Sequence, residues 1–159
     1  MKPEDLNALG AIYFENLSQG LQNPERYLFE TRRMDGQAAC RAIRKRWEAL
    51  GRERVFCDFY YFRLEQEARE RVESVLTEDE RNYLEELGKL GKGSPADEII
   101  FPLDEELLSI AAKLNETEML FSTFYFTGPV EERSTWWGNY HQEYLIFMER
   151  PYVRPYVKK

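Results

Sequence analysis

The only histidine of the chain lies among residues suited to acid–base chemistry. His141 and Glu143 are two positions apart, so in an extended strand their side chains would share one face. Histidine changes charge near neutral pH, and His141 could therefore act as a general acid or base. Together with Tyr125 and Tyr144, this pair would line a pocket beside a helix expected at residues 104–114. No serine or cysteine is spaced to be its nucleophile, which counts against catalysis. A small enzyme or small-molecule-binding protein with this pocket is therefore the second interpretation and not the first.

A second candidate site is an aromatic segment at residues 128–138, which we expect to be the long loop of a hairpin. Adjacent tryptophans in a loop cannot easily both point inwards, and Trp and Arg are the usual anchors of binding surfaces. The alternative is that the tryptophans fold back as a lid on the edge of the sheet. The candidate partner-binding residues are Arg133, Trp136, Trp137 and Tyr140.

A basic helix is expected at residues 36–50, with Gly51 ending it. It carries Arg41, Arg44, Lys45 and Arg46, which could meet the phosphates of a nucleic acid. The pI of about 5.0 argues against that function, because nucleic-acid-binding domains are usually basic. A nucleic-acid-binding protein that uses this helix is therefore the third interpretation.

Acidic residues are concentrated further along the chain. Residues 65–118 carry sixteen acidic and six basic side chains, a local charge of −10 within a net charge of −7. Such a segment could steer a basic partner, or dock copies of the chain against each other as a homo-oligomer. Many of these carboxylates fall at expected helix starts, where negative charge offsets the helix dipole. Their spacing selects no catalytic or metal-binding pair.

The cysteines and glycines give no sign of a cofactor. Cys40 and Cys57 belong to no CxxC pair, and one histidine cannot complete a zinc site with them. The glycines at 91 and 93 lack the spacing of a phosphate-binding loop. We therefore expect no metal, no cofactor and two unpaired thiols in a reducing cytosol. The first residues form no apolar signal region, and no long apolar run occurs, so we expect neither secretion nor membrane contact.

These candidate residues need a scaffold of helices and strands, which hydrophobic periodicity predicts. Apolar spacing of three and four residues predicts helices at 4–20, 24–31, 36–50, 65–90 (broken at Thr77) and 104–114. Asp35 and Asp104 are the expected caps of two of them, and Thr77 with Glu80 forms a capping box. On the helix at 36–50, the expected apolar stripe is Ala39, Ile43, Trp47 and Leu50. Dense aromatic and β-branched runs predict strands at 55–64, 98–101, 117–127 and 139–149. The order favours an α+β fold: a mainly antiparallel sheet of three to four strands, about six helices and a long C-terminal hairpin. We expect one domain over residues 1–159, with an extended Pro/Tyr tail at 150–159.

The leading hypothesis is a non-catalytic cytoplasmic protein that binds and masks another protein. The acidic segment would steer a partner with a basic surface, and the aromatic loop would anchor it. Inhibitors and immunity-type proteins act in this way. The hypothesis depends on the aromatic loop, the acidic segment and the lack of a catalytic constellation.

Overall fold

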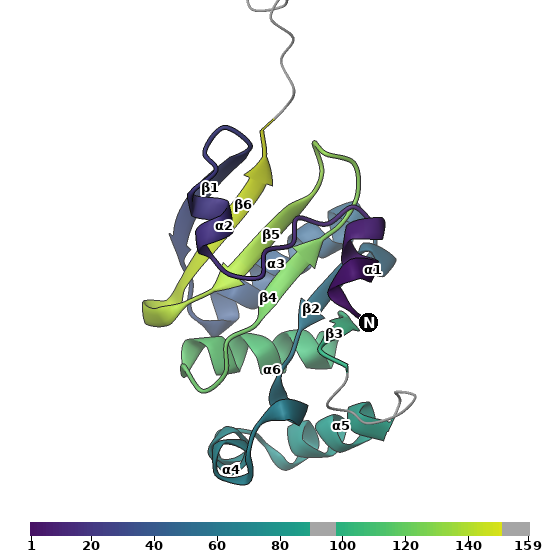
Figure 1. The fold of residues 1–159 in the computed structure, drawn as a ribbon. Coiled ribbons are helices and arrows are strands. Elements are labelled where there is room, and N and C mark those ends of the chain that lie inside the picture. Colours follow the sequence, from purple (N-terminus) through teal and green to yellow (C-terminus); the bar gives the residue numbers. More distant parts are fainter. Residues whose placement is uncertain (90–97, 151–159) are drawn as a thin grey trace, which may run out of the picture.

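A computed structural model describes residues 1–89 and 98–150 of the chain, and Figure 1 shows its architecture. The fold is α+β, as the sequence predicts. One antiparallel sheet has helices on one face and the N-terminal segment across the other (Figure 1). The described residues form six α-helices: α1 (Pro3–Ala8), α2 (Ser18–Leu21), α3 (Gly36–Leu50), α4 (Gln66–Ser74), α5 (Glu78–Lys89) and α6 (Glu105–Glu116).

Within the described ranges the sheet has six strands, not the three to four that we predicted. They are β1 (Tyr27–Arg33), β2 (Val55–Asp58), β3 (Ile100–Pro102), β4 (Thr123–Phe126), β5 (Ser134–Gly138) and β6 (Glu143–Glu149). Their spatial order is β1-β6-β5-β4-β2-β3, and every pair is antiparallel. The predicted count was too low because two strands were missed: β1, which we predicted as a helix, and β5, which we predicted as a loop.

The first error is at residues 24–31, where we predicted a helix. Pro24 after Asn23 is a typical helix start, yet Tyr27–Arg33 is strand β1. It pairs along its whole length with β6, from Tyr27 opposite Glu149 to Arg33 opposite Glu143. This ladder joins residues more than a hundred positions apart, and a local signal does not report it.

The second error is the long hairpin. Residues 128–138 are not all loop, because Ser134–Gly138 forms β5 between β4 and β6. The three strands make a meander, with a short turn before β5 and the turn at Tyr140–Gln142 after it. Trp136 and Trp137, which suggested a binding surface or a lid within a loop, lie instead on a strand, where neighbouring side chains point to opposite faces.

The helical face of the sheet holds the largest core. Helices α3 and α6 lie side by side across it (Figure 1). The side chains of Ile43, Trp47 and Leu107 are almost completely buried there against Phe124 and Phe126. The apolar stripe predicted for residues 36–50 is therefore confirmed.

Local capping signals are confirmed at the starts of α3, α5 and α6. The Asp35 carboxylate accepts a hydrogen bond from the Ala38 N–H at 2.8 Å, and Asp104 caps α6 in the same way. Thr77 and Glu80 form a reciprocal capping box with bonds of 2.8 and 3.1 Å, which separates α4 from α5.

The other face is covered by the N-terminal segment, which is not the continuous helix predicted at residues 4–20. Helix α1 ends at Ala8, and Gly10 has a φ of +83°, a conformation that glycine adopts readily. An extended stretch then crosses the sheet toward α2 (Figure 1). Its Ile12 and Phe14 side chains belong to one buried cluster with Phe147 of β6. The remaining part of the predicted tail, residues 151–159, lies outside the described residues. No helix in the described ranges is long and apolar enough to cross a membrane.

Candidate functional site

A buried carboxyl group lies on the face that the N-terminal segment covers. Asp58 is the last residue of β2, and strand alternation turns its side chain to the same face as Phe56. Only 7% of the residue is exposed to solvent. Its carboxylate accepts a hydrogen bond from the Thr123 N–H at 2.7 Å and one from the Tyr125 hydroxyl at 3.3 Å.

Burial raises the pKa of Asp58 to about 7, because a charged carboxylate loses its hydration in this site. The hydrogen bonds from Thr123 and Tyr125 act in the opposite direction and offset only part of the effect. None of the ion pairs formed within residues 1–89 and 98–150 includes Asp58. In the part of the chain that the structure describes, the group is therefore a buried acid without a counter-ion, which is unusual outside functional sites.

A small cavity of about 140 Å³ opens onto this carboxyl. Aromatic rings from four separate segments surround it: Tyr13 before α2, Tyr60 after β2, Phe121 and Tyr125 around the start of β4, and Trp137 on β5. The Tyr13 and Tyr125 rings are 6.1 Å apart between centroids. Tyr13 and Tyr60 have raised pKa values, chiefly through burial, so both hydroxyls stay protonated at neutral pH. We call this cavity the Asp58 pocket.

The start of β4, which forms one wall of the Asp58 pocket, is held by a buried amide. The Asn115 side chain accepts from the Ser122 N–H at 2.8 Å and donates to the Tyr144 hydroxyl at 3.0 Å. Gly138 passes so close that an added Cβ would lie 2.6 Å from the Asn115 amide nitrogen. Only glycine fits there, and this close approach keeps the end of β5, with Trp137, against the pocket.

The chemistry available in the Asp58 pocket is that of a carboxylate inside an aromatic box. Aromatic faces carry partial negative charge and attract cations within about 6 Å of the ring centroid. A carboxylate adds a full negative charge whenever it is ionised. The pocket is thus suited to a small cationic group, and Asp58 could also exchange a proton near neutral pH.

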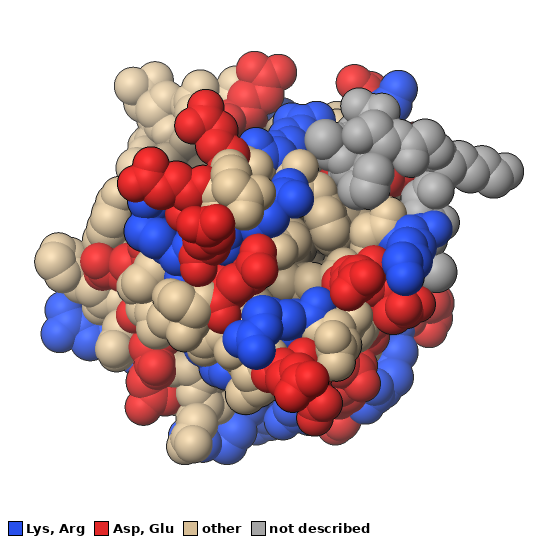
Figure 2. Space-filling model, turned by 90° about the horizontal axis from the view of Figure 1, so that it is seen from below, with Lys and Arg blue, Asp and Glu red and all other residues tan. Residues whose placement is uncertain are grey.

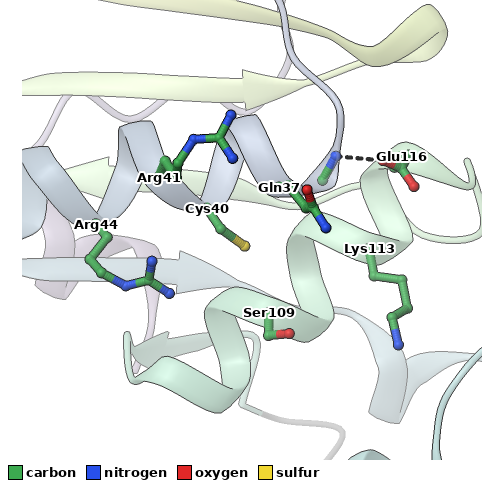
Figure 3. A pocket seen from close by; sticks show the side chains of 8 residues that line it. Gln37, Cys40, Arg41, Arg44, Ser109, Lys113 and Glu116 are labelled. Atoms are coloured by element: carbon green, nitrogen blue, oxygen red, sulfur yellow. Dashed lines mark hydrogen bonds between the residues drawn. The ribbon is translucent and has the colours of Figure 1, made fainter.

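A second, larger cavity of about 370 Å³ lies between α3 and α6, and Figure 3 shows it. Cys40 and Arg41 line one side, and Lys113 and Glu116 line the other (Figure 3). Most of its charges already have partners within the protein. Arg44 binds Glu105 at 2.9 Å, Lys113 binds Glu80 at 2.5 Å, and Glu116 accepts from the Gly36 N–H at 2.5 Å. We call this cavity the α3–α6 groove. Because most of its charged groups already have partners, it is a weaker candidate for a ligand site than the Asp58 pocket.

Both thiols are free, and their different burial leads to a testable expectation. Cys57 lies in the core with no exposed surface, whereas Cys40 is half-buried in the α3–α6 groove. Burial raises the pKa of each thiol, which lowers the thiolate fraction.

We expect an aromatic disulfide reagent to modify one thiol slowly in the folded protein, and two after denaturation. A Cys40→Ser variant should lose the native reaction, whereas fast modification of two thiols in native protein would contradict this placement.

The structure does not bring together the four residues of the pocket predicted near His141. His141 is exposed in a turn, with a φ of +62°. Its backbone N–H donates a hydrogen bond to the Glu118 carboxylate. Tyr144 points to the helical face, where it binds Asn115, and Tyr125 points to the opposite face. Glu143 begins β6 and is half-buried. Of the four, only Tyr125 reaches the Asp58 pocket.

The predicted partner-binding residues are also divided. Trp136 is 6% exposed and packs on Phe126, with ring centroids 5.1 Å apart, so little of its ring could meet a partner. The Arg133 guanidinium is bound to Glu149 at 3.1 Å. Trp137 lines the Asp58 pocket. Tyr140 is 58% exposed and stands edge-on to Phe121, with ring centroids 4.7 Å apart.

Charged side chains that are clustered in sequence are interleaved in space. Figure 2 shows Asp and Glu mixed with Lys and Arg on the side of the molecule that carries α4 and α5. On the helix predicted to bind nucleic acid, Arg44 is paired with Glu105 and Arg46 donates to the Glu132 carbonyl at 2.6 Å. Arg41 and Lys45 are exposed. Within the described ranges, no group of three or more His, Cys, Asp or Glu is arranged to hold a metal ion.

Sequence reasoning missed Asp58, Tyr13 and Tyr60 as site residues. One signal was present, because Asp58 is the only acidic residue in the otherwise apolar and aromatic run from Val55 to Phe62. An acid in such a run is either at an edge or buried for a reason. Tyr13 gave no signal, since its approach to Asp58 depends on the path of the N-terminal segment.

Comparison with known proteins gives no relative for this chain: no protein-family model, no curated protein and no solved structure matches it.

Proposed function

We propose that this protein is a non-catalytic binding module that takes a cationic ammonium group into the Asp58 pocket. The observation that carries the proposal is the buried Asp58 carboxyl, which has no counter-ion among the described residues and faces a cavity walled by aromatic rings. A bound cation would supply the missing counter-charge. It would also make contact with the faces of the surrounding rings.

The size of the pocket limits the ligand. A cavity of about 140 Å³ corresponds to four or five waters at roughly 30 Å³ each, so it holds a head group and not a whole drug-sized molecule. The rest of the ligand must lie outside the pocket, on the side of Glu15, which is the exposed residue of the lining. The side chain of a lysine on another protein meets these requirements, and so does a small free amine. The first source agrees with our hypothesis of a partner with a basic surface.

General acid–base catalysis at Asp58 is the second candidate function, favoured by its pKa of about 7. A catalyst needs further groups at the reacting atoms. The hydroxyls near Asp58 belong to Tyr13, Tyr60 and Tyr125, and their raised pKa values make them poor proton donors to a substrate. Binding therefore accounts for the site more fully than catalysis does.

Calorimetric titration of the whole protein with methylammonium, tetramethylammonium and a lysine-rich peptide tests the proposal. We expect binding at pH 8 that weakens about tenfold at pH 6, because only about a tenth of a group with a pKa near 7 is ionised there. Asp58→Asn should abolish binding. Asp79→Asn, the same change at an exposed position on α5, should leave it intact.

Two further variants separate the contributions of the rings. Tyr13→Phe keeps the ring and should retain binding, whereas Tyr13→Ala should weaken it. Binding of the peptide but not of the free amines would identify a protein side chain as the source of the cation. Binding that persists in Asp58→Asn, or strengthens at pH 6, would refute the proposal.

A further inference from the structure

One edge of the sheet is open. Within residues 1–89 and 98–150, strand β1 (Tyr27–Arg33) lies at the end of the strand order and pairs only with β6 (Figure 1). Residues 28–33 are all exposed, and Leu28 and Phe29 keep 37% and 49% of their surface accessible. Exposed edges of this length invite pairing with another strand, and proteins usually protect them.

The opposite edge shows such protection. Strand β3 has only three residues and ends with Pro102, which has no N–H to donate to another strand. The two edges therefore differ, and β1 has neither a proline nor a short length to block pairing.

The outward backbone groups of β1 can be identified from the bonds on its inner side. The Met34 N–H donates to the Gln142 carbonyl at 2.8 Å, and the Arg26 carbonyl accepts from the Arg150 N–H at 2.7 Å. Backbone groups alternate in direction along a strand. Since Arg26 and Met34 bond toward β6, the N–H and C=O groups of the even-numbered residues between them also point toward β6. The N–H and C=O groups of Phe29, Thr31 and Arg33 consequently point out of the sheet.

We propose that β1 pairs antiparallel with β1 of a second copy of this chain, with Thr31 opposite Thr31. In this register Phe29 faces Arg33 of the second copy, and the three outward residues of each strand provide about six hydrogen bonds. Glu30 faces Arg32 of the second copy, and Arg32 faces its Glu30. The two sheets become one continuous sheet across a two-fold axis.

Charge selects this register. The two nearest registers that keep outward backbone groups opposite each other are shifted by two residues. One of them places Glu30 opposite Glu30 of the second copy, and the other places Arg32 opposite Arg32. Like charges directly opposite each other destabilise an antiparallel pair, whereas opposite charges stabilise it. Within one strand the Arg32 guanidinium already lies 3.1 Å from the Glu30 carboxylate. Pairing of two strands therefore brings two Glu30 and two Arg32 side chains together, with opposite charges as neighbours. The inference is independent of the proposed function, because Asp58 belongs to the opposite half of the sheet.

Light scattering and sedimentation of the full chain over the micromolar range test the dimer. We expect the unmodified protein to dimerise, and Glu30→Arg to raise the dissociation constant roughly thirtyfold, because two symmetry-related pairs change from attraction to repulsion. The double variant Glu30→Arg, Arg32→Glu should dimerise again, because it restores opposite charges. Glu67→Arg on α4, whose side chain is 89% exposed, is the matched control and should not change the equilibrium.

Thr31→Pro provides a second, uncharged test. It removes an outward N–H while leaving the bonds to β6 in place, so it should also yield monomers. Circular dichroism must show that each variant is folded, and the charge-reversal series decides the matter if Thr31→Pro is not. An unmodified protein that stays monomeric, a dimer that persists in Glu30→Arg, or a double variant that fails to recover would each overturn the proposed pairing.

Discussion

Replacing Asp58 with Asn is expected to stabilise the protein by about 4 kcal/mol at pH 8. The pKa of Asp58 is about 7 in the folded protein and about 3.9 in an unfolded chain, and each pKa unit corresponds to about 1.36 kcal/mol. The amide is neutral and nearly the same shape, so it avoids the cost of burying a charge. It can still accept from the Thr123 N–H, which holds β2 against β4.

The sign of this effect fixes its pH dependence. Between about pH 4 and pH 7 the folded protein binds more protons at Asp58 than the unfolded chain does, so this residue lowers stability as the pH rises. Below pH 4 the carboxyl is protonated in both states and its penalty disappears, and above pH 7 the penalty is complete. Urea denaturation of both proteins should show a difference of only about 1 kcal/mol at pH 4.5 and of about 4 kcal/mol at pH 8.

Asp79→Asn is the control, since this exposed acid on α5 should change stability little at either pH. An Asp58→Asn variant that is less stable than the unmodified protein at pH 8 would show that the hydrogen bonds to the carboxylate outweigh its burial. If Asp58→Asn is more stable and yet loses cation binding, the two results together identify a residue kept for function at a cost in stability.

Trp47→Ala is expected to destabilise the protein by about 3–5 kcal/mol. Trp47 is 2% exposed in the core between α3 and the sheet, so its removal leaves a large cavity. Its indole N–H also donates to the Arg52 carbonyl at 2.9 Å, and the Arg52 guanidinium lies 4.3 Å from its ring. The variant would lose all three interactions at once.

Chemical denaturation at neutral pH measures this loss. Trp47→Phe is a graded comparison, since it keeps most of the buried ring and should cost less than Trp47→Ala. Ala49→Ser, on the exposed side of the same helix, controls for changes in helix propensity. A loss below 1 kcal/mol for Trp47→Ala would contradict its position in the core.

The sequence predicted the features that depend on neighbouring residues. The start and end of α3 are set by Asp35 and Gly51, and the break between α4 and α5 by Thr77 with Glu80. These are contacts between residues at most four positions apart, so their signals are complete within a short window. The apolar stripe with Ile43 and Trp47 was predictable for the same reason.

The strands show where such reasoning fails. Tyr27–Arg33 follows a good helix start, and Trp136 and Trp137 resemble an exposed loop pair, yet both segments are strands of the sheet. Each is stabilised by hydrogen bonds to β6, a strand that local windows do not include. The strand propensity of a segment depends on what it pairs with and which face is buried.

The sequence by itself determined the α+β class, the capped helices and the core stripe of α3, because periodicity and capping are local properties. The tertiary structure decided the number of strands, the pairing of the charges and the identity of the candidate site. Tyr125 and Trp137 were among the predicted site residues, but only folding places them around Asp58. The pKa of that carboxyl is raised by desolvation, which depends on every segment packed around it, and no single stretch of sequence specifies that environment.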